Sequence, residues 1–497
     1  MHFLHRQLLS AIACCALVLG VTASGVAQVR AGEGQQFSLP DFGSSADTLL
    51  TTGEERRLGR AFMHSVRKSL PVIADPLLSG YIADLGQGLV EASGEGGRHF
   101  SFFLIDEPVV NAFAGPDGHI GIYAGLVLAA QTESELAAVV AHEIAHVTQR
   151  HLMRAFEDTR KMSLPATALL IGAAILGAQV SSDAGAAAMA GVQAAAVQRQ
   201  INFTRDNEKE ADRLGIVMLA GAGYSPYAMA GFFERLSKGS RIQDTDAPEM
   251  LRTHPVTANR ISDALGRAKD YGHRQNPDSL RFHLVRADLR QRSYSRPEKA
   301  VAHFRATLRE GRHANETAER YGYALALVRA GQHRLAGKEA SVLLEAHPIQ
   351  DEFVILSARL DLQAGKTDRA LERLREALGL SPASLPLRIA YGEALVAAGR
   401  PAAALKALED VVGAPVAGPA LYELMAAAAV KAEDQAATYR YRAEQHYAKG
   451  EIEPAIRQLE VALRQRGLSY LEAAKIQARL AELREEQELI EDDPWSD

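Results

Sequence analysis

The chain has 497 residues, of which 47% are hydrophobic and 23% are charged, and its formal net charge at pH 7 is −6. This length predicts two or three domains, each with enough apolar residues to form a core. Because the charge balance is mildly acidic and the sequence has no basic stripe, we do not expect nucleic acid to be a partner.

The N-terminus has the pattern of a secretory signal. A positively charged start is followed by an almost wholly apolar run over residues 8–21 and then by small residues. An apolar core of about 14 residues is too short for an ordinary membrane-spanning helix. We therefore expect a signal peptide of residues 1–27, with cleavage after Ala23 or Ala31 as the alternatives, and export to the periplasm.

The only two cysteines, Cys14 and Cys15, lie inside this signal. A mature chain would then have neither a disulfide framework nor a cysteine ligand for zinc. Lipidation at Cys14 is an alternative, but the residues before it lack the usual leucine. Residues 28–46 are rich in glycine and serine and are expected to form a flexible lead into the first domain.

Residues 47–275 show a mixed pattern that predicts one domain of helices with a few strands. Helical periodicity covers residues 52–69 and 76–92, and strand patterns follow at residues 99–105 and 119–124. This domain contains every candidate site residue discussed below.

A turn-rich run leads into the second strand, shortly before a metal-binding motif. A strand in this position can lie at the edge of a cleft, where an extended polypeptide can add to it through main-chain hydrogen bonds. An ordinary core hairpin is the other interpretation. The residues that we expect to form the substrate-binding strand are Asn111, Ala112, Phe113, Gly118, His119, Ile120 and Gly121.

A helix is predicted over residues 133–154, with Thr132 as its N-cap. Because residues four apart share a helix face, His142 and His146 can bind one ion, and zinc suits a site of neutral imidazoles with one position left for water. Glu143 can take a proton from that water as it attacks a peptide carbonyl. So short a motif also arises by chance, so a buried helix with two satisfied histidines is the alternative.

An apolar stretch over residues 164–196 separates this motif from the next one. We expect a helical hairpin that packs over the cleft as a lid or makes peripheral contact with a membrane surface. A spanning helix is disfavoured, because the first apolar run is only about 17 residues long and contains a proline and two glycines.

A second helical pattern runs over residues 207–220. Glu208 and Asp212 share one face, so Glu208 can complete the ligand set while Asp212 orients a ligand histidine. Glu210 points elsewhere and is expected to be a solvated charge. The alternative is that the acidic start of this helix only complements the helix dipole.

A layout that takes all three ligands from one segment does not fit this chain. It requires a glycine and a histidine at the positions of Gln149 and Leu152. His151 falls one residue short and is expected at the surface or behind the ligands. The third ligand therefore has to come from the separate helix.

The C-terminal half shows a repeat. Gly331, Gly365 and Gly399 are 34 residues apart, which is the tetratricopeptide spacing, and each is followed five residues later by an alanine. We expect an α-solenoid over residues 276–482, in which paired helices stack into a surface that binds protein segments. Residues 483–497 are expected to form an acidic, frayed tail.

Four motifs carry a resemblance to a known family. They are His142-Glu143-x-x-His146, Asn207-Glu208-x-x-Ala211-Asp212, Asn111-Ala-Phe-Ala114 and Arg252-Thr-His-Pro-Val256. In these motifs the chain resembles the zinc metallopeptidases that include HtpX and the CAAX prenyl endopeptidases. It is most similar to the soluble periplasmic branch of β-barrel assembly-enhancing proteases, in which helical repeats follow the peptidase. The resemblance covers roughly residues 46–480.

The resemblance implies a mainly α chain with a small β-sheet, in which a zincin-like (gluzincin) metallopeptidase domain precedes the solenoid. It also implies one Zn²⁺ per chain, with His142, His146 and Glu208 as ligands and Glu143 as the general base. His254 matches a histidine that, in that branch, can occupy the open position of the ion and hold the enzyme latent. A loop histidine without this role is the alternative.

The resemblance further implies a periplasmic zinc-dependent endopeptidase that degrades misfolded or stalled envelope proteins and assists outer-membrane β-barrel assembly. Its substrates would be unfolded or misassembled envelope proteins, and its repeats would dock on the outer-membrane β-barrel assembly machinery. The alternative is a periplasmic chaperone or adaptor that uses its repeats and has a latent zinc site. A purely structural zinc protein is disfavoured, because Glu143 would have no role in it.

Overall fold

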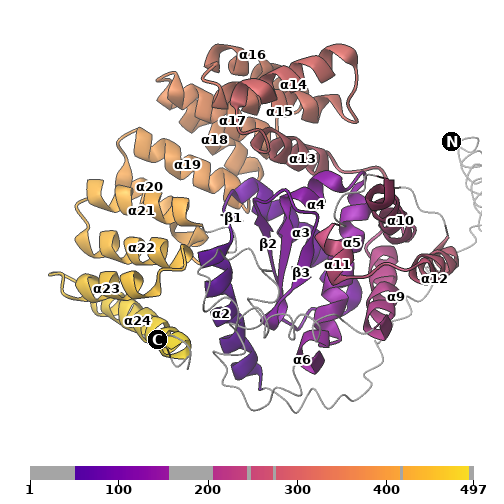
Figure 1. Cartoon of the computed structure of the whole chain (residues 1–497). Coiled ribbons are helices and arrows are strands. Elements are labelled where there is room, and N and C mark those ends of the chain that lie inside the picture. Colours follow the sequence, from indigo (N-terminus) through magenta and orange to yellow (C-terminus); the bar gives the residue numbers. More distant parts are fainter. Residues whose placement is uncertain (1–50, 156–204, 243–247, 273–275, 415–417, 492–497) are drawn as a thin grey trace, which may run out of the picture. The chain divides into compact units, whose positions relative to one another are not determined.

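The computed structural model describes residues 51–155, 205–242, 248–272, 276–414 and 418–491 (Figure 1). The predicted signal peptide, flexible lead and apolar hairpin lie outside these residues. None of the helices that are described combines the length and the apolar content needed to cross a membrane. The described chain is mainly helical with one small sheet, which confirms the predicted fold class.

Two helices open the first domain, and local sequence signals determine where each begins. α2 (Thr52–Ser69) starts at a capping box, in which the Thr51 hydroxyl accepts from the Glu54 backbone N–H and the Glu54 carboxylate accepts from that of Thr51. α3 (Pro76–Ser93) follows Asp75, whose carboxylate accepts backbone N–H groups of the first turn. Both helices lie where the helical periodicity predicts them.

A four-stranded sheet lies next to these helices. Its strands are β1 (Val72–Ile73), β2 (Ser101–Ile105), β3 (Ala112–Ala114) and β4 (His119–Tyr123). Their order is β1-β2-β4-β3, with β4 parallel to β2 and antiparallel to β3, so β3 forms an edge. Phe113 lies opposite Gly121, where a Cβ atom would come within 2.5 Å of the Phe113 ring, so glycine is required there. The two shortest strands, β1 and β3, were not predicted separately because they are too short to show alternation.

α5 (Glu133–Thr148) is buried along its whole length. Its N-cap is Thr132, as predicted, whose hydroxyl accepts the Glu135 backbone N–H at 3.2 Å. The prediction of one continuous helix is wrong, because the chain turns at Arg150 with a φ of 51° before α6 (His151–Ala155) begins. A single left-handed residue leaves no trace in the apolar periodicity.

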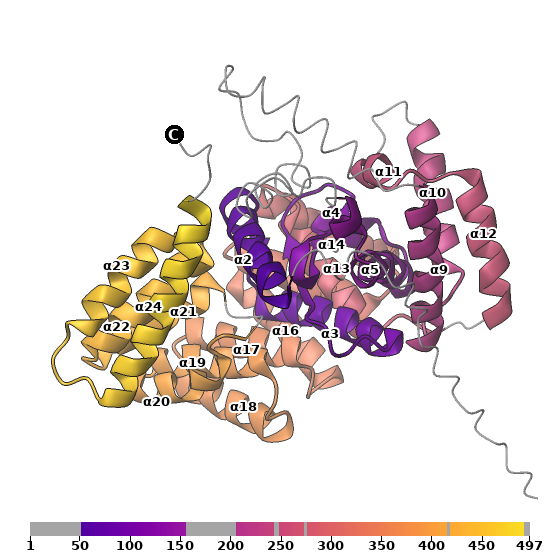
Figure 2. The same ribbon diagram turned by 90° about the horizontal axis from the view of Figure 1, so that it is seen from below.

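The first domain has five more helices that matter for the site. They are α4 (Ala124–Ala129), α9 (Arg205–Gly221), α10 (Ala228–Ile242), α11 (Glu249–Thr253) and α12 (Ala258–Ala268). α9 packs along α5, and α9, α10 and α12 lie side by side (Figures 1 and 2). The helices approach closely at Gly215 of α9, where a Cβ atom would lie 2.7 Å from Met229 Cε of α10 and 3.4 Å from the His142 backbone nitrogen of α5.

Pairs of helices form the second domain. They are α13 (Leu280–Arg292), α14 (Pro297–Glu310), α15 (Glu316–Arg329), α16 (His333–Ala346), α17 (Asp351–Gln363), α18 (Thr367–Leu380), α19 (Leu385–Ala397), α20 (Pro401–Leu408), α21 (Pro419–Lys431), α22 (Gln435–Ala448), α23 (Ile452–Leu463) and α24 (Tyr470–Glu491). The two helices within each of the pairs α15–α16, α17–α18 and α19–α20 are joined by a turn that contains a glycine. These glycines are Gly331, Gly365 and Gly399, with φ of 70°, 71° and 70°. Glycine adopts this left-handed conformation without strain. Ala336 and Ala370, five residues after two of these glycines, are fully buried where the helices meet.

The predicted acidic tail is helical as far as the end of α24. Leu483 is fully buried, and Glu486 accepts a hydrogen bond of 3.2 Å from the Tyr447 hydroxyl. The prediction of a frayed segment is therefore wrong for this part. The acidic composition hid an apolar stripe, in which Ile476, Leu480 and Leu483 follow one another at helical spacing and pack together.

The two domains contact each other through polar and apolar side chains. Arg292 of α13 donates to Asp75 at the start of α3 over 2.9 Å. Leu77 of α3 belongs to the same apolar cluster as Ile355 and Leu387 of the repeats. α3 therefore shares a core with the middle repeats, from α17 to α19.

Our first prediction concerns His119 and the stability of the fold. Burial lowers the pKa of His119 to about 3, whereas the unfolded chain has the ordinary value of about 6.5. Below that value the unfolded state binds a proton that the folded state does not, so the free energy of unfolding falls as the pH falls. As the pH falls from about 7.5 to about 5.5, the free energy of unfolding of His119→Gln should decrease by about 1 kcal/mol less than that of the parent.

Urea unfolding with a chelator present measures this difference without a contribution from bound metal. His333→Gln, at an exposed position in the repeats, is the control and should follow the parent. An identical pH slope in His119→Gln and the parent would show that His119 does not contribute.

Candidate metal centre

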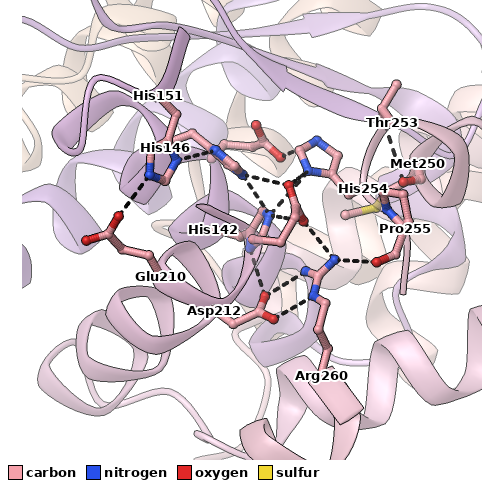
Figure 3. A network of polar contacts seen from close by, with 12 residues as sticks. His142, His146, His151, Glu210, Asp212, Met250, Thr253, His254, Pro255 and Arg260 are labelled. Atoms are coloured by element: carbon pink, nitrogen blue, oxygen red, sulfur yellow. Dashed lines mark hydrogen bonds and ion pairs between the residues drawn. The ribbon is translucent and has the colours of Figure 1, made fainter. Parts of the chain in front are cut away.

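Four buried side chains from three parts of the first domain converge at one point (Figure 3). α5 supplies His142 and His146, α9 supplies Glu208, and the loop after α11 supplies His254. One nitrogen or oxygen atom from each of them lies within 4.8 Å of the others. The structure thus brings together the two motif histidines and the carboxylate that the sequence analysis assigned to them.

The distances between these atoms suit a single ion. His142 Nε2 lies 3.0 Å from His146 Nε2 and 3.5 Å from Glu208 Oε2, and His146 Nε2 lies 3.5 Å from Glu208 Oε1. Donor atoms about 2.0–2.2 Å from a tetrahedral ion are roughly 3.3 Å apart. All three distances therefore lie near the spacing of donor atoms around a zinc-sized cation, with the two histidines each facing a different oxygen of Glu208.

The charge of the site also fits a divalent cation. Among the described residues of the site, the buried carboxylates are Glu143, Glu208 and Asp212, and the buried guanidinium is Arg260. With neutral imidazoles, three carboxylates against one guanidinium leave an excess of two negative charges. Unbalanced charge in a buried site is costly, and a bound divalent cation would remove that cost.

Asp212 and Arg260 hold the ligands from behind. Asp212 Oδ1 lies 3.0 Å from His142 Nδ1, as predicted for a residue that orients a ligand histidine. Arg260 donates to both oxygens of Asp212 at 2.7 and 2.8 Å and lies 2.7 Å from Glu208 Oε2. Although burial opposes ionisation, Arg260 and His142 hold the pKa of Asp212 below its ordinary value.

Arg260 was missed by the sequence analysis. It lies at the start of α12, six residues after His254, and a single sequence offers no signal that an arginine there reaches a carboxylate on α9. Only the packing of α12 against α9 and α10 places it in the site.

Glu143 lies beside the ligand cluster. Its side chain is buried, and Oε1 is 3.5 Å from His254 Nε2. Burial raises the pKa of the Glu143 carboxyl, against the opposing charges of His254 and His142. A raised pKa suits a carboxylate that takes a proton from water near neutral pH.

His254 is the fourth member of the cluster and the one that comes from a loop. Its Nδ1 is 3.0 Å from Glu208 Oε1 and 3.3 Å from His142 Nε2. Two contacts anchor the segment that carries it. The backbone N–H of Met250 donates to the Val110 carbonyl over 3.2 Å, and Arg260 donates to the Pro255 carbonyl over 2.9 Å.

His151 and Glu210 differ from the sequence analysis. His151 is fully buried, with Nδ1 2.8 Å from His146 Nδ1 and Nε2 3.2 Å from Glu210 Oε2. Of the two places expected for His151, the structure selects the one behind the ligands. The expectation that Glu210 is only a solvated charge is wrong, because the break between α5 and α6 brings His151 to it.

The predicted substrate strand is only partly at an edge. Its first three residues, Asn111–Phe113, lie in or next to β3, which in the described part of the chain has a strand on one side only. Gly118 lies in a turn with a φ of 73°. The last three residues, His119–Gly121, lie in β4 between β2 and β3, so a substrate cannot pair with them. The alternation pattern cannot distinguish an interior strand from an edge strand.

Comparisons with known proteins give relatives of this chain. Residues 76–268 match peptidase family M48, and residues 361–428 match a tetratricopeptide repeat. The chain is 34% identical over 472 residues to the β-barrel assembly-enhancing protease of Escherichia coli K12, covering 95% of this chain and 96% of that protein. It is 33% identical over 449 residues to the protein of that name from Yersinia pestis, covering 90% and 92%. A tetratricopeptide repeat protein from Parabacteroides merdae aligns with 50% of this chain and 98% of its own at 15% identity, with a TM-score of 0.28.

Our second prediction concerns metal binding by Glu208. The purified protein should bind about one zinc ion per chain, and Glu208→Gln should weaken binding by more than the roughly 100-fold that loss of a residue behind the ligands can cause. The reason is that an amide keeps the shape of the side chain but removes the anionic ligand. A competition titration with a chelating dye measures the affinity.

Asp206→Asn is the matched control, because Asp206 lies in the first turn of the same helix and its side chain is 93% exposed. It should bind zinc like the parent. If Glu208→Gln is folded and also binds like the parent, Glu208 is not a ligand.

Proposed function

This chain belongs to peptidase family M48 and is a metalloprotease related to the β-barrel assembly-enhancing proteases, and from this premise we propose that it is a zinc-dependent endopeptidase of the periplasm. We propose that it degrades misfolded or stalled envelope proteins and assists outer-membrane β-barrel assembly. One observation carries the proposal: His142 and His146 of α5 meet Glu208 of α9 with Glu143 beside them.

The roles of the site residues follow from their positions. A divalent cation held by His142, His146 and Glu208 would polarise the substrate carbonyl and the attacking water. Glu143 takes the proton of that water and delivers it to the leaving amine. Asp212 keeps His142 in the orientation and tautomer that a ligand needs.

The edge strand β3 suits an extended substrate. Residues 111–114 lie at the edge of the sheet, and β3 contacts the helix that carries the motif. A polypeptide that adds to this edge would be held through its main chain, with little dependence on its sequence. A folded protein pairs or protects most of its strands, so this mode of binding favours unfolded or misassembled proteins.

His254 is proposed as the residue that keeps the enzyme latent. A fourth protein donor closes a zinc site and leaves no place for water. α11 has only five residues, and a loop movement can break both the main-chain hydrogen bond of Met250 and the hydrogen bond from the Arg260 side chain to the Pro255 carbonyl. Opening is then a shift between two populated states. The same closed state favours the second candidate function, a chaperone or adaptor that acts through its repeats.

The repeats are proposed to bind substrates or the outer-membrane β-barrel assembly machinery. The repeat domain presents apolar side chains to solvent, with Ile349 in the loop after α16, Leu380 at the end of α18 and Tyr470 at the start of α24 exposed by 69%, 70% and 91%. Single exposed apolar residues are common, but docking surfaces for protein segments need them. Any peripheral membrane contact is assigned to the apolar hairpin, which lies outside the described residues.

Our third prediction tests the general base. Glu143→Gln should lower the rate of cleavage of an unfolded β-barrel protein by about 10²- to 10⁴-fold, because the amide cannot take a proton. Zinc content should stay the same, since Glu143 is not assigned as a ligand. Product formation on gels and metal analysis measure the two quantities.

Cleavage at the parental rate by zinc-loaded Glu143→Gln would contradict the assignment. If the parent and the variant both bind the substrate but neither cleaves it, the chaperone function is favoured instead.

Our fourth prediction tests latency. His254→Ala should raise the rate of cleavage by up to about 10-fold, the gain expected if the open state of the parent is about a tenth populated. Thr253→Ala is the neighbouring control, because the Thr253 hydroxyl bonds only to carbonyls of its own helix. Unchanged or lower activity in zinc-loaded His254→Ala would count against the proposal that His254 keeps the enzyme latent.

A further inference from the structure

A buried histidine and a carboxylate support His146 on the side away from the other ligands (Figure 3). His146 Nδ1 lies 2.8 Å from His151 Nδ1, and His151 Nε2 lies 3.2 Å from Glu210 Oε2. The His151 side chain is fully buried, so these contacts are made away from bulk water. The proteolytic mechanism described above makes no use of them.

The chemistry of a ligand fixes the direction of these hydrogen bonds. His146 Nε2 faces the other donor atoms, so it must carry a lone pair and the ring proton must be on Nδ1. That N–H then donates to His151 Nδ1, which puts the remaining proton of a neutral His151 on Nε2. Nε2–H in turn donates to the Glu210 carboxylate. One arrangement of protons thus satisfies both hydrogen bonds, from His146 to His151 and from His151 to Glu210.

A break in the helix brings His151 into contact with His146. On a continuous helix, residues five apart point about 140° away from each other, so His151 would not lie behind His146. The left-handed Arg150 interrupts the helix and turns His151 towards His146. Such a conformation costs a non-glycine residue roughly 1–2 kcal/mol, and the 3.2 Å ion pair between Arg150 and Glu55 helps to hold it.

α9 thereby supplies a carboxylate for each part of the site. Glu208 faces the ligand histidines directly, Asp212 supports His142, and Glu210 reaches His146 through His151. The two supports differ in strength. Asp212 is buried and bound by Arg260, whereas the Glu210 side chain is 21% exposed and also lies 3.8 Å from Arg154.

We propose that His151 and Glu210 are positioning residues that fix the orientation and the tautomer of His146, and that they thereby set the affinity of the metal site. This inference rests on the metal site in the proposed function. Partners behind a ligand histidine typically contribute 10- to 100-fold, in order of magnitude, to metal affinity.

The test compares zinc affinities of the full chain by competition with a chelating dye. His151→Phe keeps a buried ring but removes both nitrogens, and it should raise the dissociation constant by about 10- to 100-fold. His151→Gln should restore most of the affinity, because its amide can accept from His146 and donate to Glu210. Glu210→Ala should weaken binding less than His151→Phe, and this partly exposed position tolerates the change if His151→Phe fails to fold.

Arg154→Gln is the matched control, because it removes only the more distant partner of Glu210, and it should bind zinc like the parent. Urea unfolding of the metal-free variants separates affinity from stability. In the cobalt-loaded protein, the exchangeable Nδ1–H proton of His146 should exchange with water faster in His151→Phe than in His151→Gln. A general loss of packing would not produce this difference.

The possible failures are distinct. If the parent binds zinc and folded His151→Phe and Glu210→Ala bind it equally well, the positioning role is wrong and the proposed function stands. If the parent binds no zinc, the proposed function is wrong and this inference falls with it.

Discussion

The packing of α9 against α5 is the contact on which the rest of the site depends. Neither helix holds enough ligands for an ion, and only their close approach places Glu208 3.5 Å from the ring nitrogens of both His142 and His146. At Gly215 the backbone of α9 comes so close to α5 that a Cβ atom would touch the His142 backbone nitrogen at van der Waals distance, 3.4 Å. The packing of these two helices therefore governs the geometry of the candidate ligand set.

Arg260 connects the candidate ligand set to the segment that we propose closes it. Its guanidinium contacts Glu208 and Asp212, and it also donates to the carbonyl of Pro255, next to His254. An opening movement would give up the Pro255 contact while the two carboxylates stay bound. Because hydrogen bonds between two oppositely charged groups are stronger than a hydrogen bond from a guanidinium to a neutral carbonyl, the loop is the part expected to move.

The sequence by itself determined the features that depend on local geometry. Helical spacing placed His142 and His146 on one face, and it placed Glu208 and Asp212 together on another helix. The 34-residue spacing of glycines identified the helix pairs, because each turn needs a left-handed residue. These signals repeat within a few turns or at a fixed period, so no knowledge of distant contacts is needed to find them.

Only the tertiary structure decided which residues from distant elements meet. It placed Arg260 against Asp212, linked Glu210 to His146 through His151, and made β4 an interior strand. The contact of Glu210 with His146 through His151 depends on the break in the helix at Arg150, although the apolar pattern of the sequence continues across this break. Contacts of this kind arise from packing between elements, and neither spacing nor composition encodes which side chain a buried polar group will find.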